Sequence, residues 1–312
     1  MKKIETVSLI GLGAMGVFFA PKLQQTLGDK FRIIADGDRK KRLESNGVVV
    51  NDKKYQFPII EPDTKGEPAD LVIISVKGYA LDQAIQDLKY QVGDDTQILC
   101  VLNGVDSEEK VEKAFGKEHV LYSYMRVSIV MKHQIAEFDP NLGCVHFGEA
   151  INIEGNYSDR VLAVKELFDR AGITYRIDKD MIRGQWFKFM CNVGENMTCA
   201  LLGIPFGAFR TSEAANHIRR GAMREVIQIA NKKGIALSQE DMDHQEVTLM
   251  KLPYQNKPST LQDLEIGKKT EVDMFAGTVI QLGQQYGVPT PINEMFYHGI
   301  HVLEEKNDGL IS

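Results

Sequence analysis

Several features that would assign this chain to a class are missing from its sequence. No apolar run approaches the ~18 residues that a membrane-spanning helix needs, so we expect no membrane span. The four cysteines, Cys100, Cys144, Cys191 and Cys199, form no CxxC pair, and the seven histidines form no HExxH motif. We therefore expect free thiols in a reducing compartment and no metal site.

An excess of basic charge is also missing. Lysine and arginine number 37 against 43 acidic residues, which gives a net charge of −6. This balance argues against nucleic acid or an anionic membrane as the main partner. The start, MKKIETVSLIGLG, has no long apolar segment before its glycines, so we expect no signal peptide and a cytoplasmic protein. The length of 312 residues suggests two domains, and 43% hydrophobic residues are enough for their cores.

Short apolar runs alternate with helical patterns in the first part of the chain. The predicted strands are VSLIGLG, FRIIAD, DLVIISVK and QILCVLN, and the predicted helices span 15–27, 80–88 and 107–115. This βαβ alternation predicts a parallel sheet with helices on both faces. Residues 120–177 are rich in strand patterns at hairpin spacing, with one helix near 158–171, and predict a mixed or antiparallel extension.

The remaining sequence is helical in pattern. We expect helices at 181–202, 212–234, 260–286 and 292–305. The predicted domains are a dinucleotide-binding domain at 1–179 and an all-helical substrate domain at 180–312. No repeat, low-complexity stretch or long linker separates them, so we expect the two domains to pack directly and form a cleft.

A glycine-rich loop follows the first predicted strand and precedes the first helix. Gly11, Gly13 and Gly16 form G-x-G-x-x-G. In a dinucleotide site the first glycine permits the tight turn, the second lets the backbone approach the pyrophosphate, and the third lets helix and strand pack closely. The N-terminus of the helix binds the phosphates. The alternative is a tight turn without a ligand. The predicted cofactor-binding loop comprises Gly11, Leu12, Gly13, Ala14, Met15 and Gly16.

An acidic residue ends the second predicted strand. Asp36 stands twenty residues after Gly16, where a carboxylate binds the 2′-hydroxyl of the adenine ribose and repels a 2′-phosphate. This residue favours NAD. The next residues include Arg39, Lys40 and Lys41, which could bind a phosphate and keep NADP open, although a solvated helix start explains them more simply.

Two polar residues follow the next two predicted strands. Lys77 stands in SVKG and Asn103 in LNG. Open α/β sheets bind ligands at the carboxyl ends of their strands. Either residue alone could belong to a loop, because Asn-Gly is a common turn pair. Together with the glycine loop they predict a binding site at this edge.

A polar stripe crosses an otherwise apolar helix in WFKFMCNVGEN, residues 186–196. Lys188, Asn192 and Asn196 recur every fourth residue, so they share one side of an α-helix. Burying a lysine or an asparagine without partners costs on the order of a few kcal/mol. The stripe must therefore face water or a polar partner.

These motifs together resemble the ketopantoate reductase family. The similarity covers most of the chain and includes GLGAMG, SVKGYAL, LNG, WFKFMCNVGEN and the string SxLQDxxxGxxTEVD at 259–273. The resemblance implies a Rossmann-type doubly wound domain followed by an all-helical domain, with the active site between them. It also implies reduction of a 2-oxo acid, usually by NADPH, to the (R)- or D-2-hydroxy acid.

The resemblance also implies roles for individual residues. Lys188 is the expected general acid, and Glu271 is expected to orient this lysine and the cofactor ribose. The residues expected around the substrate are Asn103, Asn192, Asn196, Phe206, Asn256 and Ser259, and those around the nicotinamide side are Lys77 and Asn103. The chemistry agrees, because negative charge develops on the carbonyl oxygen during hydride transfer and needs a donor. A nearby carboxylate keeps a lysine charged.

Two positions depart from the family pattern. The family usually has a basic residue where Asp36 stands, and members that use ketopantoate commonly have asparagine where Phe206 falls. Both departures favour an NADH-linked dehydrogenase of D-2-hydroxy acids, acting on C3-branched or aromatic 2-oxo acids in the manner of D-mandelate dehydrogenase. Phe206 could instead be an ordinary core residue.

Two other functions stay open on the sequence alone. One is an NADPH-dependent 2-dehydropantoate 2-reductase that tolerates Asp36. The other is a dinucleotide-binding sensor without catalysis, which would not need Lys188 or Glu271. The long amphipathic helices are compatible with a homodimer or with a simple core.

Overall fold

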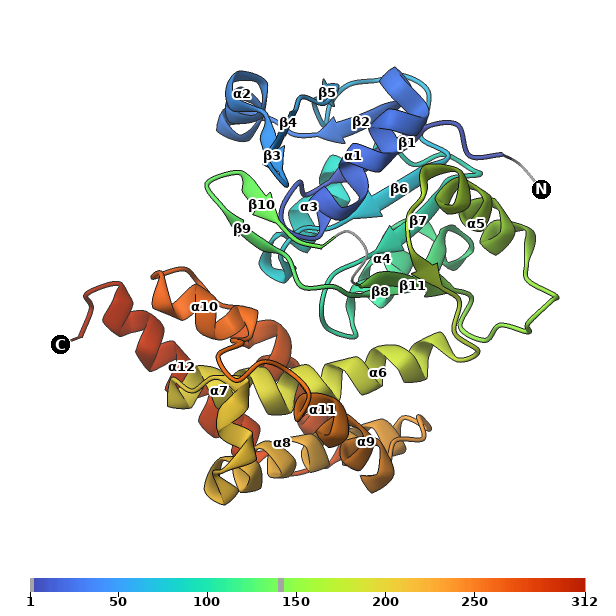
Figure 1. Ribbon diagram of the computed structural model, residues 1–312. Helices are drawn as coiled ribbons and strands as arrows, with labels where there is room; N and C mark the ends of the chain where they lie inside the picture. Colours follow the sequence, from blue (N-terminus) through green and yellow to red (C-terminus); the bar gives the residue numbers. More distant parts are fainter. Residues whose placement is uncertain (1–2, 140–142, 312) are drawn as a thin grey trace. The chain divides into compact units, whose positions relative to one another are not determined.

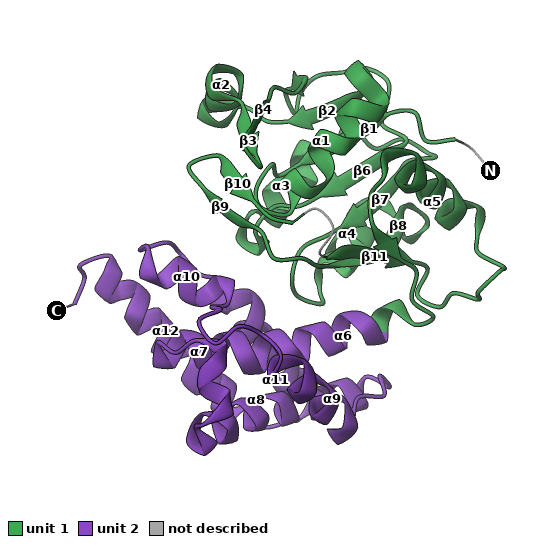
Figure 2. Cartoon of the chain, viewed as in Figure 1, with its two compact units in different colours: residues 1–182 green, residues 183–312 purple. Residues whose placement is uncertain are grey.

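The computed structural model describes residues 3–139 and 143–311. The chain divides into two compact units, Met1–Ile182 and Arg183–Ser312, which Figure 2 shows in green and purple. The boundary expected from the sequence, after residue 179, lies three residues before this division. Each unit has its own architecture.

Unit 1 is built on an eight-stranded sheet in its described residues (Figure 1). Its strand order is β12-β11-β8-β7-β6-β1-β2-β5. The strands are β1 (Val7–Ile10), β2 (Phe31–Ile34), β5 (Ile59–Ile60), β6 (Leu71–Ile74), β7 (Gln97–Cys100), β8 (Val120–Arg126), β11 (Cys144–Gly148) and β12 (Tyr175–Arg176). All neighbours pair in parallel except β8 and β11, which are antiparallel.

The order β5-β2-β1-β6-β7-β8 is that of a doubly wound dinucleotide-binding sheet, in which the order of the strands reverses between β1 and β6. Both β1 and β6 are buried along their whole length, as expected for strands covered on both faces. The helices are α1 (Gly16–Leu27), α2 (Gly37–Asn46), α3 (Leu81–Asp87), α4 (Ser107–Phe115) and α5 (Asp159–Ala171). Helix α1 packs against α5, and α3 packs against α4. The predicted fold class is confirmed for this unit.

The strand-rich segment 120–177 divides between two sheets. The pairing of β8 with β11 is the antiparallel extension that the sequence predicts. However, β9 (Val130–Lys132) and β10 (Ile135–Glu137) leave it and join β3 (Val48–Val50) and β4 (Lys53–Tyr55) in a smaller sheet of order β4-β3-β10-β9. This second sheet was not predicted from the sequence.

Unit 2 is helical throughout its described residues, as predicted. Its elements are α6 (Met181–Cys191), η4 (Asn192–Asn196), α7 (Met197–Leu202), η5 (Phe206–Arg210), α8 (Glu213–Lys232), α9 (Gln239–Leu249), α10 (Ser259–Glu265), η6 (Asp273–Gly277), α11 (Thr278–Tyr286) and α12 (Pro291–Asn307); α6 begins two residues before the division. No helix in the described ranges is long and apolar enough to cross a membrane.

Two predicted helices differ from the structure. The single helix expected at 260–286 is wrong, because α10 ends at Glu265 and Gly267 takes a φ of +66° that turns the chain. The long helix expected at 181–202 is continuous but contains a π turn, η4. Helix α9 was not predicted; its capping box, formed by Ser238 and Asp241, is a start signal that the sequence contains.

Candidate active site

The glycine loop lies directly after β1, and two of its glycines are required by sterics. Gly11 has a φ of +96°, and a Cβ there would lie 2.6 Å from the carbonyl carbon of Ser75. A Cβ on Gly16 would lie 2.5 Å from the carbonyl oxygen of Gly11. A Cβ on Gly13 would meet nothing within 4 Å, so the backbone is open to a ligand at that point. This combination fits a bound pyrophosphate.

Hydrogen bonds fix the shape of this loop. The hydroxyl of Ser75 donates to the carbonyl of Gly11 at 2.7 Å, and the amide of Gly13 donates to the same oxygen at 2.8 Å. The guanidinium of Arg39 donates to the carbonyl of Leu12. Helix α1 has no side-chain cap and no acidic residue in its first turn. The amides of Val17 and Phe18 donate to the carbonyls of Gly13 and Met15, so the contribution of this N-terminus to phosphate binding is the positive end of the helix dipole.

Four strands end in register at one edge of the sheet. The paired ends of β2, β1, β6 and β7 are Ile34, Ile10, Ile74 and Cys100. Because these strands are parallel, the segments that follow them leave the sheet at the same carboxyl edge, where such folds bind ligands.

The sequence-predicted residues of unit 1 follow these strand ends. Gly11 comes one residue after the end of β1 and Asp36 two residues after the end of β2. Lys77 and Asn103 each come three residues after the ends of β6 and β7. Lys77 is exposed and Asn103 half-buried. The fold therefore gathers all four at one edge. The support that Ser75 gives to the loop was not predicted.

Asp36 lies outside the strand that it was expected to end, because β2 stops at Ile34 and Asp36 is the N-cap residue of α2. Its side chain is exposed. Arg39, one turn into the helix, is half-buried against the loop, and burial lowers the pKa of its guanidinium. Lys40 forms an ion pair with Glu61 at 2.8 Å. The two basic side chains nearest to Asp36 thus have partners within the protein.

In unit 2, the polar stripe falls on a π turn. Lys188 is half-buried on α6, and Asn192 and Asn196 are the first and last residues of η4. A π turn replaces the i→i+4 hydrogen bond by i→i+5, and such turns inside α-helices occur frequently at functional sites. The sequence predicts a regular α-helical row for these three side chains. This prediction is wrong in that respect, because the π turn interrupts the row.

Helix α8 supports this π turn. A Cβ on Gly194 would lie 2.5 Å from the side chain of Met223, so the two helices approach closely. Arg219 on α8 is fully buried, with its Nη1 atom 3.9 Å from Oε1 of Glu195 in η4. Gln245 also donates to Glu195 at 2.9 Å. This buried network was not predicted, and its members are far apart in the sequence.

Glu271 precedes a second π turn, η6. Its side chain is 7% exposed. The segments η4 and η6 contact each other, and the rings of Phe189 and Phe275 lie 6.3 Å apart between their centroids. Lys188 lies four residues before η4 and Glu271 two residues before η6, so the segments that follow these two residues contact each other.

The remaining predicted residues, Phe206, Asn256 and Ser259, lie in η5, in the segment before α10 and in α10, respectively. The amide of Phe206 donates to the carbonyl of Asn256 at 2.9 Å, which joins these two segments. Ser259 is the first residue of α10, and this helix contacts η4. Phe206 itself is half-buried and packs on an apolar cluster that includes Cys199 and Phe209. A core role for its ring is thus visible in the structure.

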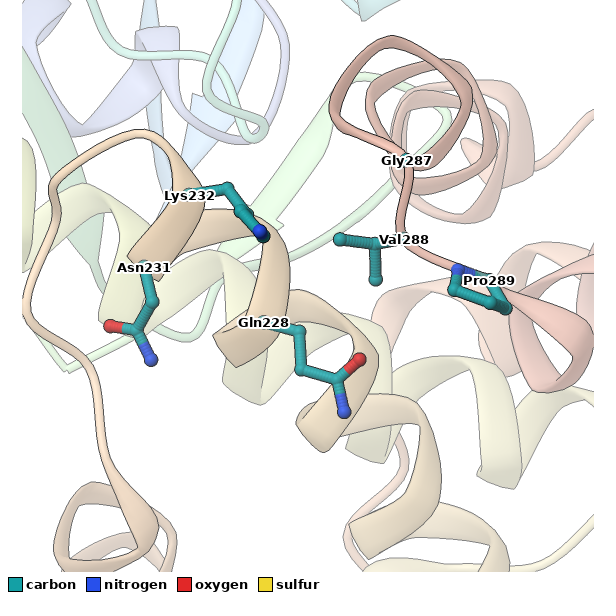
Figure 3. Close-up of a pocket in the computed structure, with 6 residues that line it drawn as sticks. All are labelled: Gln228, Asn231, Lys232, Gly287, Val288 and Pro289. Atoms are coloured by element: carbon teal, nitrogen blue, oxygen red, sulfur yellow. The ribbon is translucent and has the colours of Figure 1, made fainter.

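A surface hollow of unit 2 lies elsewhere. Figure 3 shows it between the end of α8 and the segment after α11, lined by Gln228, Asn231, Lys232, Gly287, Val288 and Pro289. None of these residues was predicted to belong to the site.

A doubly wound sheet with a glycine loop, followed by a helical unit, is the architecture of an NAD(P)-dependent oxidoreductase. Residues 7–139 match the family model described as ketopantoate reductase PanE/ApbA, and residues 180–304 match the model of its C-terminal domain. The chain belongs to the ketopantoate reductase family.

Individual relatives agree with this assignment. The chain is 26% identical to a 2-dehydropantoate 2-reductase of Streptococcus pyogenes over 302 residues, covering 96% of this chain and 97% of the relative. A structure of D-mandelate dehydrogenase with NADH and anilino(oxo)acetate has the same fold, with a TM-score of 0.84, 22% identity and coverage of 97% and 99%. A dimeric ketopantoate reductase from Staphylococcus aureus superposes with a TM-score of 0.79 at 18% identity, covering 97% and 99%.

Proposed function

We propose that this protein transfers hydride from NADH to the carbonyl of a C3-branched or aromatic 2-oxo acid and forms the D-(R)-2-hydroxy acid. Family membership supports an NAD(P)-dependent reductase of 2-oxo acids. The choice of cofactor and of substrate rests on two side chains, Asp36 and Phe206.

The environment of Asp36 carries the cofactor assignment. A carboxylate two residues beyond β2 can accept hydrogen bonds from the ribose hydroxyls of NADH and repels the 2′-phosphate of NADPH. The basic residues nearby offer the phosphate little compensation. Arg39 is bound to the carbonyl of Leu12, Lys40 is paired with Glu61, and Lys41 lies 3.7 Å from a carboxylate oxygen of Asp38.

Phe206 carries the substrate assignment. An aromatic ring in place of an amide removes a donor for a hydroxyl of ketopantoate and offers apolar surface to a bulky side chain. The ring lies half-buried on an apolar cluster, with part of its surface accessible. Such a position suits contact with a branched or aromatic acceptor.

The proposed mechanism assigns cofactor binding to the glycine loop and Asp36, and proton donation to Lys188. The dinucleotide, held by the glycine loop and Asp36, supplies the hydride when bound. Lys188 donates a hydrogen bond to the carbonyl oxygen of the substrate and then a proton, as negative charge develops there. The buried carboxylate of Glu271 favours the charged form of a nearby lysine. Asn192, Asn196 and Ser259 bind the substrate carboxylate.

A second candidate is an NADPH-dependent 2-dehydropantoate 2-reductase. The curated relative from Streptococcus pyogenes has this name, and the similarity extends over 96% of the chain. Under this alternative Asp36 would tolerate the 2′-phosphate, and Phe206 would be a core residue only. A sensor without catalysis is a weaker third candidate, because it gives Lys188 no role.

Initial rates of the purified protein distinguish these candidates. NADH and NADPH are each combined with ketopantoate and with benzoylformate, followed by 2-oxoisovalerate, and chiral analysis identifies the product. The proposal predicts the highest kcat/KM for NADH with the bulky acids and a D-hydroxy acid product. Highest kcat/KM for NADPH with ketopantoate would overturn it in favour of the second candidate. No turnover with any pair, together with tight binding of NADH, would favour the sensor.

A further inference from the structure

A connected set of polar side chains lies in unit 1, outside the residues assigned to reduction. The Sγ atom of Cys144 lies 3.4 Å from Nε2 of His146. Nδ1 of the same imidazole lies 2.7 Å from Oδ2 of Asp178, and the hydroxyl of Tyr124 donates to that oxygen at 2.6 Å. A thiol, an imidazole and a carboxylate in this order form the arrangement in which a base activates a nucleophile and a third group orients the base.

The sheet holds these groups on one face. In the antiparallel pair β8–β11, His146 stands opposite Tyr124 and Cys144 opposite Arg126. Residues two apart along a strand point to the same face, so all four side chains share it. The rings of Tyr124 and His146 stack at 4.3 Å with an angle of 13°. On the other side, β12 places Arg176 in register with His146.

The imidazole beside the thiol has a polar partner at each ring nitrogen. Burial lowers the pKa of His146, but its hydrogen bonds with Asp178 and Cys144 outweigh burial, and the net pKa is raised. The Nδ1–H group donates to Asp178, which leaves Nε2 to take the thiol proton. Arg126, opposite Cys144 on β8, and Arg176, in register with His146 on β12, add positive charge to this part of the sheet. Reactive cysteines lie in partly exposed, electropositive surroundings of this kind.

Accessibility also distinguishes this cysteine. All four cysteines lie in described segments, and Cys100, Cys191 and Cys199 are buried whereas Cys144 is partly exposed. Burial raises the pKa of the thiols of Cys100 and Cys199. Only Cys144 thus combines access from solvent with an adjacent base, and the other three cysteines serve as controls in the same chain.

We propose that Cys144 is a reactive thiol that is oxidised by hydroperoxides, with His146 as its base and Asp178 as the residue that orients the base. His146 takes the thiol proton, and the thiolate sulfur attacks the distal oxygen of the hydroperoxide. The S–O bond forms while the O–O bond breaks, and the leaving oxygen takes the proton from the imidazolium. The cysteine is oxidised to a sulfenic acid and the hydroperoxide is reduced to an alcohol, or to water when hydrogen peroxide reacts.

The test measures each thiol of the full-length protein separately. The protein is treated with iodoacetamide at a series of pH values, or with hydrogen peroxide and a sulfenic acid trap, and the modification of each cysteine is followed by peptide mass spectrometry. We expect Cys144 to react at least tenfold faster than the other three cysteines. A Cys144 that reacts no faster than the three buried cysteines in the wild-type protein would overturn the proposal.

Variants separate activation from simple exposure. His146→Gln should slow the alkylation of Cys144 near neutral pH at least tenfold, and Asp178→Asn should slow it to a smaller extent. His119→Gln is the matched control, because His119 is a buried histidine of the same unit that contacts the carbonyl of Thr96. Thermal melts confirm that each variant is folded. Unchanged Cys144 reactivity in folded His146→Gln would show that these bonds only support the structure.

Discussion

The hydroxyl of Ser75 donates a 2.7 Å hydrogen bond to the carbonyl oxygen of Gly11. This bond joins the segment after β6 to the glycine loop after β1, across the point at which the order of the strands reverses. The same serine limits the space at both ends of the loop, since a Cβ on Gly11 would touch its carbonyl carbon at 2.6 Å and a Cβ on Gly16 its Oγ at 3.0 Å. Ser75 therefore determines the conformation that would bind the phosphates.

Replacement of Ser75 by alanine should weaken dinucleotide binding. Loss of one hydrogen bond of about 1 kcal/mol would raise the Kd for NADH roughly fivefold if the loop must re-form on binding. Fluorescence titration measures this constant. Ser123→Ala is the control, because Ser123 is also buried and donates to a backbone carbonyl, that of Cys100, away from the loop. An equal Kd for NADH in Ser75→Ala and Ser123→Ala would show that the bond to Gly11 contributes only to the stability of the fold.

Replacement of Asp36 by alanine should move cofactor preference toward NADPH. A hydrogen bond to a charged group contributes about 1.5–3 kcal/mol, so the ratio of kcat/KM for NADH to that for NADPH should fall by roughly 10- to 100-fold. Asp29→Ala makes the same change in net charge at an exposed position of the same unit and should leave this ratio almost unchanged. A similar shift in both variants would indicate a general effect of charge rather than a contact with the ribose.

Replacement of Phe206 by asparagine should move acceptor preference toward ketopantoate. One pocket side chain changes selectivity by about 1–3 kcal/mol, so the ratio of kcat/KM for benzoylformate to that for ketopantoate should fall by roughly 5- to 150-fold. Leu252→Asn alters another partly buried residue of the same apolar cluster. Both variants should lower the melting temperature. A selectivity ratio that Phe206→Asn leaves unchanged would assign the ring to the core alone.

The pair of His146 and Asp178 should stabilise the fold within a limited pH window. The pKa of His146 is raised above its ordinary 6.5, so its contribution is complete below that pH and disappears as the pH rises through the folded value. The pKa of Asp178 is lowered below 3.8, because hydrogen bonds from His146 and Tyr124 outweigh burial. The contribution of Asp178 to stability is therefore complete above about pH 4 and is lost as the pH falls through the folded value. Both contributions to stability are therefore complete between about pH 4 and about pH 6.5.

Denaturant unfolding of the wild-type protein and of His146→Gln measures this window. The difference in the free energy of unfolding should be largest near about pH 5 and clearly smaller near about pH 9. A difference that is the same at both pH values would contradict the linkage.

The parts of the fold that depend on local sequence signals were predictable. Gly11 and Gly16 must be glycines for steric reasons, and the apolar runs of β1 and β6 are typical of strands buried on both faces. The register of neighbouring strands then follows from the doubly wound topology, and it brings Asp36, Lys77 and Asn103 to one edge. These residues could be grouped without a structure because parallel strands share a direction.

Other features depend on contacts between distant residues. The π turns η4 and η6 insert an extra residue into a helical turn, and no residue type marks this insertion in advance. The break at Gly267 interrupts a pattern that reads as helix on both sides. The small sheet joins 48–55 to 130–137, and the ion pair of Arg219 with Glu195 joins α8 to η4. Only the folded chain brings such partners together.

The proton donor is the central element of the proposed reaction, and Lys188→Ala tests it most directly. The measurement is the kcat for benzoylformate with saturating NADH, together with the Kd for NADH, in this variant and in the control Lys232→Ala, which alters an exposed lysine of α8. Loss of a general acid should lower kcat by roughly 10²–10⁴-fold, while the Kd for NADH stays within about twofold of the wild-type value and the control retains full activity. A Lys188→Ala variant that keeps its kcat would contradict the proposed mechanism.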